Sequence, residues 1–248
     1  MAVYKSFTFD GITSSNYGVY ITGEAVFNAP ARAVEMVNVP GRNGAIAIDQ
    51  GRFENIEVTY PSGMFDDGAS GFQSRITEFR NILLSRYTYK RLTDEYNPDE
   101  FRMGLYKSGL DVSPAQLRAG QFNITFDCKP QRWLTSGETV QTFSSSSTIN
   151  NPTLFDARPL LEVKGLGTLT LGTSVLTITD GGTGANQVLF IDCEAQEAWE
   201  LVSSVKVSRN NCIQYASNDF PTLAPGSNTV GLGTGITQVK ITPRWWRI

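Results

Sequence analysis

The chain has 248 residues and a mass of 27.2 kDa, of which 40% are hydrophobic and 18% charged. This composition fits one large or two small folded domains and excludes a disordered chain. No apolar run approaches the roughly 20 residues that cross a bilayer, and the amino terminus lacks the basic start of a signal peptide, so we expect neither membrane insertion nor export. A net charge of −3 disfavours stable nucleic-acid binding.

The chain contains no histidine. Serine–histidine and cysteine–histidine hydrolases and most catalytic zinc sites are therefore excluded. Cys128, Cys193 and Cys212 are odd in number and widely spaced, so we expect buried free thiols. The glycine clusters match no phosphate-binding motif, and acidic neighbours such as Asp94 and Glu95 do not face each other as a glycosidase pair does. We predict a protein that is not an enzyme, with no catalytic residue, metal or cofactor.

The first long extended segment covers residues 29–60 and turns at residues 40–44 (PGRNG), where glycine and asparagine tolerate positive φ. We expect a projecting hairpin arm here. Such an arm leaves strand edges unpaired unless a neighbouring chain covers them. Pro40, Arg42 and Asn43 are therefore candidate interface residues.

One segment has helical periodicity. Its apolar positions share a single face, namely Phe72, Ile76, Phe79 and Leu83. Ser70 and Gln73 stand in a capping-box relation, and Arg86 lies in the expected last turn. We predict a helix over about residues 70–86 that packs on a sheet.

Short strands with period-two alternation recur elsewhere, for example over Phe122, Ile124 and Phe126, so the fold class is mainly β. Residues 144–152 (SSSSTINNP) have no periodicity and predict a linker between domains at 1–143 and 153–248. The second domain has short strands separated by glycine turns, which indicates a β-sandwich. Residues 236–248 either finish that domain or return to the first, and we favour a return.

The carboxyl terminus contains two tryptophans in succession. If the strand continues past Pro243, Ile241 and Trp245 face one way and Trp246 faces the polar side. We expect Trp246 to pack against another domain or subunit, and the alternative is that it lies flat on its own domain. Trp245 and Trp246 are therefore also candidate interface residues.

Fragments spread over nearly the whole chain resemble the distal tail protein family of long-tailed siphophages. They are residues 15–19 (SNYGV), 39–44 (VPGRNG), 89–94 (YKRLTD), 126–130 (FDCKP), 192–194 (DCE), 218–223 (NDFPTL), 225–229 (PGSNT) and 243–246 (PRWW). Their order and spacing together carry the resemblance.

The resemblance implies a ring-forming first domain with one helix and an arm, and a galectin-like β-sandwich as the second. It implies a virion structural protein at the tail tip or baseplate, made in the host cytoplasm. Its expected partners are further copies in a hexameric ring, the major tail tube protein, a tail-associated fibre or lysin protein and the tape measure protein. DNA would pass through the ring without specific binding. The alternative function is a baseplate module that binds host cell-wall saccharides.

Overall fold

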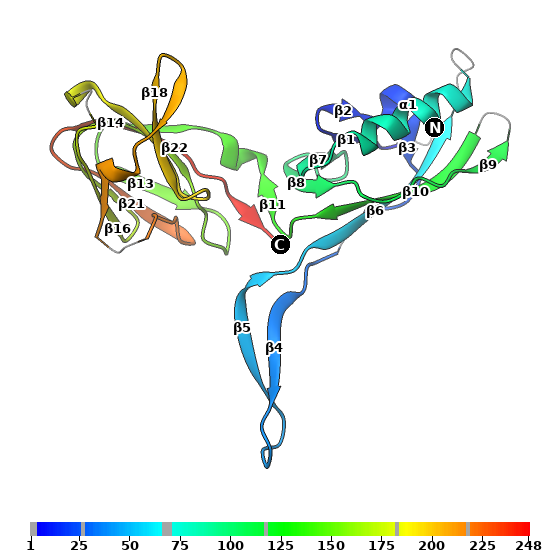
Figure 1. The fold of residues 1–248 in the computed structure, drawn as a ribbon, viewed down its shortest axis with the longest axis horizontal. Coiled ribbons are helices and arrows are strands. Elements are labelled where there is room, and N and C mark those ends of the chain that lie inside the picture. Colours follow the sequence, from blue (N-terminus) through cyan, green and yellow to red (C-terminus); the bar gives the residue numbers. More distant parts are fainter. Residues whose placement is uncertain (1–3, 26–27, 66–70, 117–118, 182–183, 217–218) are drawn as a thin grey trace. The chain divides into compact units, whose positions relative to one another are not determined.

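The computed structural model describes residues 4–25, 28–65, 71–116, 119–181, 184–216 and 219–248. The chain forms two compact units, Met1–Arg132 with Ile248, and Trp133–Arg247 (Figure 1). Within the described ranges, antiparallel strands dominate and α1 (Phe72–Leu84) is the α-helix, so the mainly β prediction is confirmed. No helix in those ranges is long and apolar enough to span a membrane.

The first unit is built on one twisted sheet. Its strands, in spatial order, are β2 (Ile12–Thr13), β1 (Phe7–Phe9), β7 (Lys90–Asp94), β8 (Glu100–Leu105), β10 (Ala119–Cys128), β6 (Ile56–Phe65) and β3 (Val19–Ile21), with β9 (Ser113–Gln116) beside β10. The central pair β6 and β10 is in register from Ile56 opposite Cys128 to Phe65 opposite Ala119. Strand β3 lies at one end of the order and is an edge.

Helix α1 covers one face of this sheet (Figure 1). Its predicted apolar face is confirmed, because Ile76, Phe79 and Leu83 are buried. Residue Gly71 precedes the helix with a φ of 78° and no side-chain cap, whereas Ser70 lies outside the described residues. Arg86 lies beyond the last turn, but its Nη1 donates to the carbonyl of Ile82 at 3.1 Å and so satisfies a terminal acceptor.

An aromatic core joins the helix to the sheet. The Phe7 ring stacks on Tyr60 with centroids 5.4 Å apart and meets Phe126 edge-on at 5.6 Å. The Phe79 ring of the helix packs on Phe7 at 6.4 Å and on Tyr17 at 5.9 Å. These rings bury large apolar areas, which holds α1 against the sheet.

A separate two-stranded sheet is formed by β4 (Arg32–Asn38) and β5 (Ala45–Phe53), which confirms the predicted hairpin arm. We call this sheet the ribbon. Two residues, Glu54 and Asn55, separate it from β6.

The second unit is a β-sandwich. One sheet contains β12 (Gln141–Phe143), β22 (Ile236–Thr242), β14 (Leu160–Gly165), β17 (Val188–Asp192), β18 (Glu197–Val202) and β19 (Val205–Ser208). The other contains β13 (Ser147–Asn151), β21 (Gly226–Leu232), β15 (Gly167–Leu171), β16 (Ser174–Ile178) and β20 (Ile213–Tyr215). Side chains from both sheets, such as Val163 and Leu169, form one core. Strand β11 (Arg132–Leu134) pairs with β23 (Trp246–Arg247).

Short 3-10 helices also occur between the strands. They are η1 (Ser14–Tyr17), η2 (Thr135–Glu138), η3 (Gly184–Asn186) and η4 (Asn210–Cys212).

The structure divides the chain earlier than the serine-rich run suggested, between Arg132 and Trp133. Residues 147–151 of the expected linker form β13, which pairs with β21. The polar side chains there complete hydrogen bonds: Asn151 Nδ2 donates to the carbonyl of Leu223 at 2.9 Å, and Ser146 Oγ accepts from the amide of Leu232 at 3.0 Å. A linker-like composition thus belongs to structured residues of the sandwich.

The carboxyl-terminal segment also differs from the favoured expectation. Strand β22 pairs with β14 and β12, so residues 236–247 finish the second unit, and Ile248 alone is grouped with the first. The amide of Arg244 donates to the carbonyl of Gly137 at 2.8 Å, and that of Leu134 donates to Trp245 at 2.9 Å. The segment is therefore tied to the start of its own unit.

We expect Gly137→Ala to destabilise the second unit. A Cβ at residue 137 would lie 2.3 Å from the backbone nitrogen of Trp245, so the main chain would have to move. Such overpacking costs about 1–3 kcal/mol. Gly109→Ala is the control, because its added Cβ meets no atom within 4 Å. Denaturant unfolding of both variants checks this, and equal midpoints would contradict it.

An ion pair also holds the carboxyl-terminal segment to its own unit. Arg244 Nη1 and Nη2 donate to the two carboxylate oxygens of Asp192 at 2.7 and 2.9 Å. Burial acts to raise the pKa of Asp192, but the guanidinium and the amides of Glu194 and Ala195 outweigh it and hold the pKa below the ordinary 3.8. Because the folded-state pKa is lowered, this stabilisation is complete above pH 3.8 and is lost as the pH falls through the folded-state value.

We therefore expect Arg244→Ala to lower the unfolding free energy at pH 7 by about 2 kcal/mol. Its stability should also fall less than that of the wild type on acidification, since the ion pair is already gone. Asp192→Asn is the matched variant, because its amide oxygen can still accept from the turn amides. Urea unfolding at pH 7 and pH 3 checks both, and a parallel acid loss in all three proteins would contradict the assignment.

Candidate assembly surface

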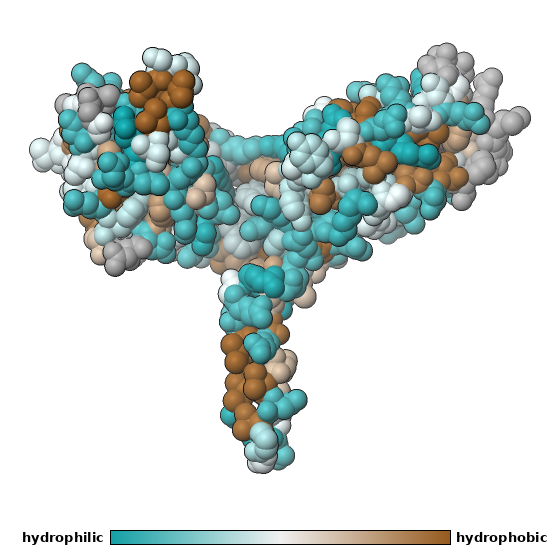
Figure 2. Space-filling model, viewed as in Figure 1, coloured by the Kyte–Doolittle hydropathy of each residue, from teal (hydrophilic) through white to brown (hydrophobic). Residues whose placement is uncertain are grey.

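The ribbon exposes apolar side chains on both of its faces. Met36 lies opposite Ala47, and Val37 lies opposite Ile46 on the other face. The exposed fractions are 61% for Met36, 48% for Ile48 and 40% for Val34. Figure 2 shows these hydrophobic side chains along the ribbon. The described part of the chain covers neither face, which is unusual for apolar strands in water.

The base of the ribbon is held in a fixed bend. A β-bulge interrupts the register between Arg32 and Val34, and Gly51 has a φ of 70°. The Arg32 guanidinium makes a bidentate contact with Asp49, whose Oδ1 also accepts from the amide of Gly51 at 3.0 Å. Bulges bend and twist a strand pair, so we expect the two strands to twist at this end of the ribbon.

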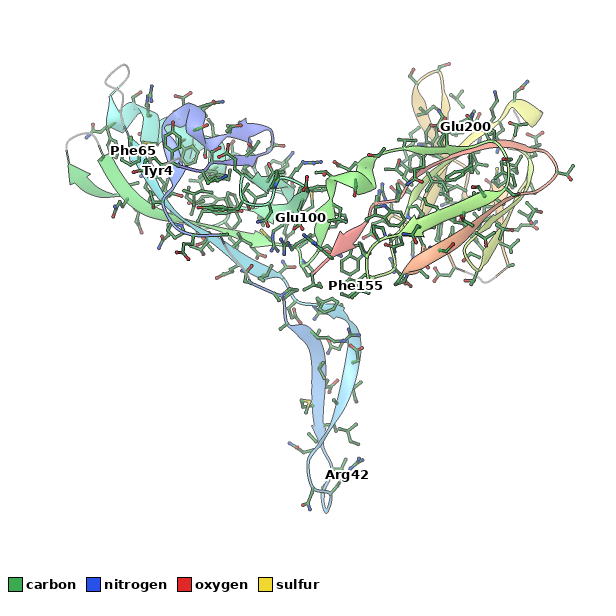
Figure 3. All side chains as sticks on the ribbon, turned by 180° about the vertical axis from the view of Figure 1, so that it is seen from behind. Tyr4, Arg42, Phe65, Glu100, Phe155 and Glu200 are labelled. Atoms are coloured by element: carbon green, nitrogen blue, oxygen red, sulfur yellow. The ribbon has the colours of Figure 1, made fainter. Side chains whose placement is uncertain are left out.

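The tip contains three sequence-predicted candidates. The amide of Arg42 donates to the carbonyl of Val39 at 3.1 Å, and Gly41 has a φ of 81°, as a type II turn with Pro40 at its second position requires. Pro40, Arg42 and Asn43 are exposed, and Arg42 lies at the end of the ribbon (Figure 3). Among the described residues, neither Arg42 nor Asn43 has a side-chain partner.

The two tryptophans lie elsewhere. Trp245 is only 3% exposed and belongs to the core of the second unit, so it offers no surface for a subunit contact. Trp246 stacks on Phe155 with ring centroids 4.4 Å apart, and its indole nitrogen donates to the carbonyl of Asp156 at 2.9 Å. Trp246 thus lies flat on its own unit, which was the alternative expectation. Both tryptophans belong to the second unit, whereas Pro40, Arg42 and Asn43 belong to the ribbon of the first unit.

The three cysteine thiols are shielded from solvent. The predicted buried free thiols are confirmed for Cys128, Cys193 and Cys212. Burial raises the pKa of Cys128 to about 12 and that of Cys193 further, so both stay protonated at neutral pH. Within the described ranges, no cluster of three potential metal-ligating side chains occurs.

The outer face of the six-stranded sheet carries an aromatic pair that bears on saccharide binding. Phe190 and Trp199 are cross-strand neighbours with parallel rings 5.7 Å apart. The ammonium of Lys206, which also pairs with Glu197, lies 3.8 Å from the centroid of the Trp199 ring. The indole thus already contacts an aromatic ring and an ammonium group of its own unit, with which a sugar ring would have to compete.

Sequence reasoning selected the tip of the ribbon and missed the apolar residues along it. A signal was present, because residues 45–48 (AIAI) have no charge and residues 34–37 (VEMV) have only one. It also missed an exposed aromatic cluster in the first unit, formed by Tyr4, Tyr20 and Phe65. These three residues are far apart in sequence, so only the fold could assemble them.

Comparison with known proteins finds similarity to phage tail proteins. Residues 12–128, within the first unit, match the family model of the phage tail protein RIFT-related domain. This portion of the chain is therefore similar to a phage tail protein domain. No curated protein matches the chain in sequence.

Solved structures extend the likeness to the second unit. The SPP1 Dit protein, described as a paradigm of the hub adsorption apparatus in Gram-positive infecting phages, matches with a TM-score of 0.67 at 16% identity over 99% of this chain and 100% of that chain. A chain of the phage p2 baseplate in its activated conformation matches with a TM-score of 0.50 at 9% identity over 96% of this chain and 98% of that one. The family match over residues 12–128 and the fold shared with SPP1 Dit agree with the resemblance to siphophage distal tail proteins.

Proposed function

We propose that this protein is a distal tail protein that forms a hexameric ring between the tail tube and the baseplate or tail-tip fibre protein. The observation that carries the proposal is the ribbon, whose apolar faces are uncovered by the described part of the chain. Burial of apolar surface drives association at roughly 25 cal/mol per Å², so a second chain is the natural cover. The fold shared with SPP1 Dit over the whole chain supports the same role.

The ring would continue the channel through which DNA leaves the virion. Each copy contributes a net charge of −3, and an acidic assembly repels the DNA backbone instead of binding it. The partners of the ring would be the major tail tube protein on one side and a fibre, lysin or tape measure protein on the other. The protein would be made in the host cytoplasm and carried at the tail tip.

Mass photometry of the purified protein, alone and with the tail tube protein, tests this proposal. We expect particles of six times the 27.2 kDa chain mass, at least in the presence of the tube protein. Gold-labelled antibody should then mark the tail tip of intact virions. Monomers in every mixture, or labelling along the tube or capsid, would contradict the proposal.

A further inference from the structure

An exposed aromatic cluster lies on the first unit. The Tyr4 ring lies 6.1 Å from that of Tyr20 and 5.6 Å from that of Phe65, measured between centroids. Tyr20 and Phe65 are 6.4 Å apart, which closes the group. The exposed fractions are 49% for Tyr4 and 42% for Phe65. We call these three residues the aromatic cluster.

The cluster has the chemistry of a binding hot spot. Among the described residues, no hydrogen-bond partner is found for the hydroxyl of Tyr4 or Tyr20. Tyrosine is enriched at the centre of interfaces because its ring buries a large area and its hydroxyl binds a polar atom at the rim. A matching partner presents aliphatic side chains beside unsatisfied backbone groups.

The ribbon presents that combination. Met36 and Ile48 supply exposed aliphatic side chains. Among the described residues the ribbon is a sheet of two strands, so each strand has one edge without a strand partner there. Phenolic hydroxyls can bond the carbonyl and amide groups of such an edge. We propose that the aromatic cluster binds the ribbon of a second copy of the chain, and we call the cluster in this role the seat of the ribbon. This proposal rests on the ring proposed above.

The position of the two surfaces explains why the occupant is a second copy. The ribbon joins β6 at Ile56, and Phe65 is the last residue of the same strand. A strand of ten residues is about 30 Å long. Figure 3 shows Arg42 at the tip of the ribbon and Tyr4 and Phe65 at the other end of the first unit. A donor at one end and an acceptor at the other give a head-to-tail contact between copies, which is the kind of contact that builds a ring when the rotation between neighbours closes.

Cross-linking in assembled tails tests the seat directly. A photoreactive benzoylphenylalanine replaces Met36, an exposed position at which the fold should tolerate the change. After irradiation of tails, we expect a product of twice the chain mass whose cross-linked peptide contains Tyr20 or Phe65. Cross-links confined to other segments, to another protein or to the same chain would overturn the proposal, as would the lack of any cross-link.

Mixing two variants tests the head-to-tail contact. Met36→Asp with Ile48→Asp disables the ribbon and leaves the cluster intact, whereas Tyr4→Asp with Phe65→Asp does the reverse. Under conditions in which the wild type forms rings, each variant alone should stay monomeric. The protein concentration at which half of the chains assemble should be roughly 30-fold or more higher for each variant than for the wild type. Their mixture should form dimers and nothing larger, because only one joint can close.

These experiments give different results if the contact between ribbon and aromatic cluster is wrong and if the proposed ring is wrong. If the wild type never assembles, the proposed function fails. If the cluster variant still forms rings, or the mixture stays monomeric, the ring stands and the seat is overturned. An unchanged unfolding midpoint shows that the cluster variant is folded, and Tyr20→Phe, which removes one hydroxyl, provides a mild second variant that should weaken assembly less.

Discussion

Replacing Met36 and Ile48 with aspartate should abolish ring formation without destabilising the fold. The two side chains are exposed, and surface substitutions away from special features change stability by at most about 0.5 kcal/mol. In an assembled ring they would be buried, where an unpaired carboxylate costs several kcal/mol at each joint. Six such joints would be affected together, so the loss should be complete at concentrations at which the wild type assembles. Mass photometry and thermal unfolding of the same samples give the two readouts.

The control carries the same chemistry at another exposed site. Val205→Asp changes an exposed valine in the second unit to the same residue and should leave ring formation intact. If the variant with Met36 and Ile48 replaced forms rings normally, the ribbon does not hold the ring together. A lowered unfolding midpoint in that variant would instead show that these side chains support the monomer.

Truncating Phe79 to alanine should have the largest effect on stability. Its ring is 1% exposed and packs on Phe7 and Tyr17, so the substitution leaves a cavity between helix α1 and the sheet. Removing a buried phenylalanine costs about 3–5 kcal/mol. Denaturant unfolding measures the loss. Leu84→Ala on the same helix is the control, because Leu84 is half exposed and should lose far less. Equal losses in the two variants would show that the buried face is assigned wrongly.

The sequence was most informative where one physical rule dominates. The face of Ile76, Phe79 and Leu83 follows from helical periodicity, because a helix on a sheet buries one side only. The ribbon follows from the turn at residues 40–44, since Gly41 must adopt positive φ. Both features depend on residues that are close in sequence, so they can be predicted without knowledge of the rest of the fold.

The features that could not be predicted from the sequence depend on contacts between segments that are far apart in the chain. Residues 144–152 look like a linker by composition, yet β21 supplies the strand partner that orders β13. Trp246 looked unpartnered until the fold brought Phe155 beneath its ring. The aromatic cluster joins three segments through the edge of the sheet, so no periodicity within one segment reveals it.

Cryo-electron microscopy of the assembled tail tip would show directly where the chain lies and whether its ribbons are covered. We predict a ring of six copies between the tail tube and the baseplate, with every ribbon covered by a neighbouring subunit. A particle in which the chain occupies another position, or in which the ribbons extend into solvent without a contact, would contradict it.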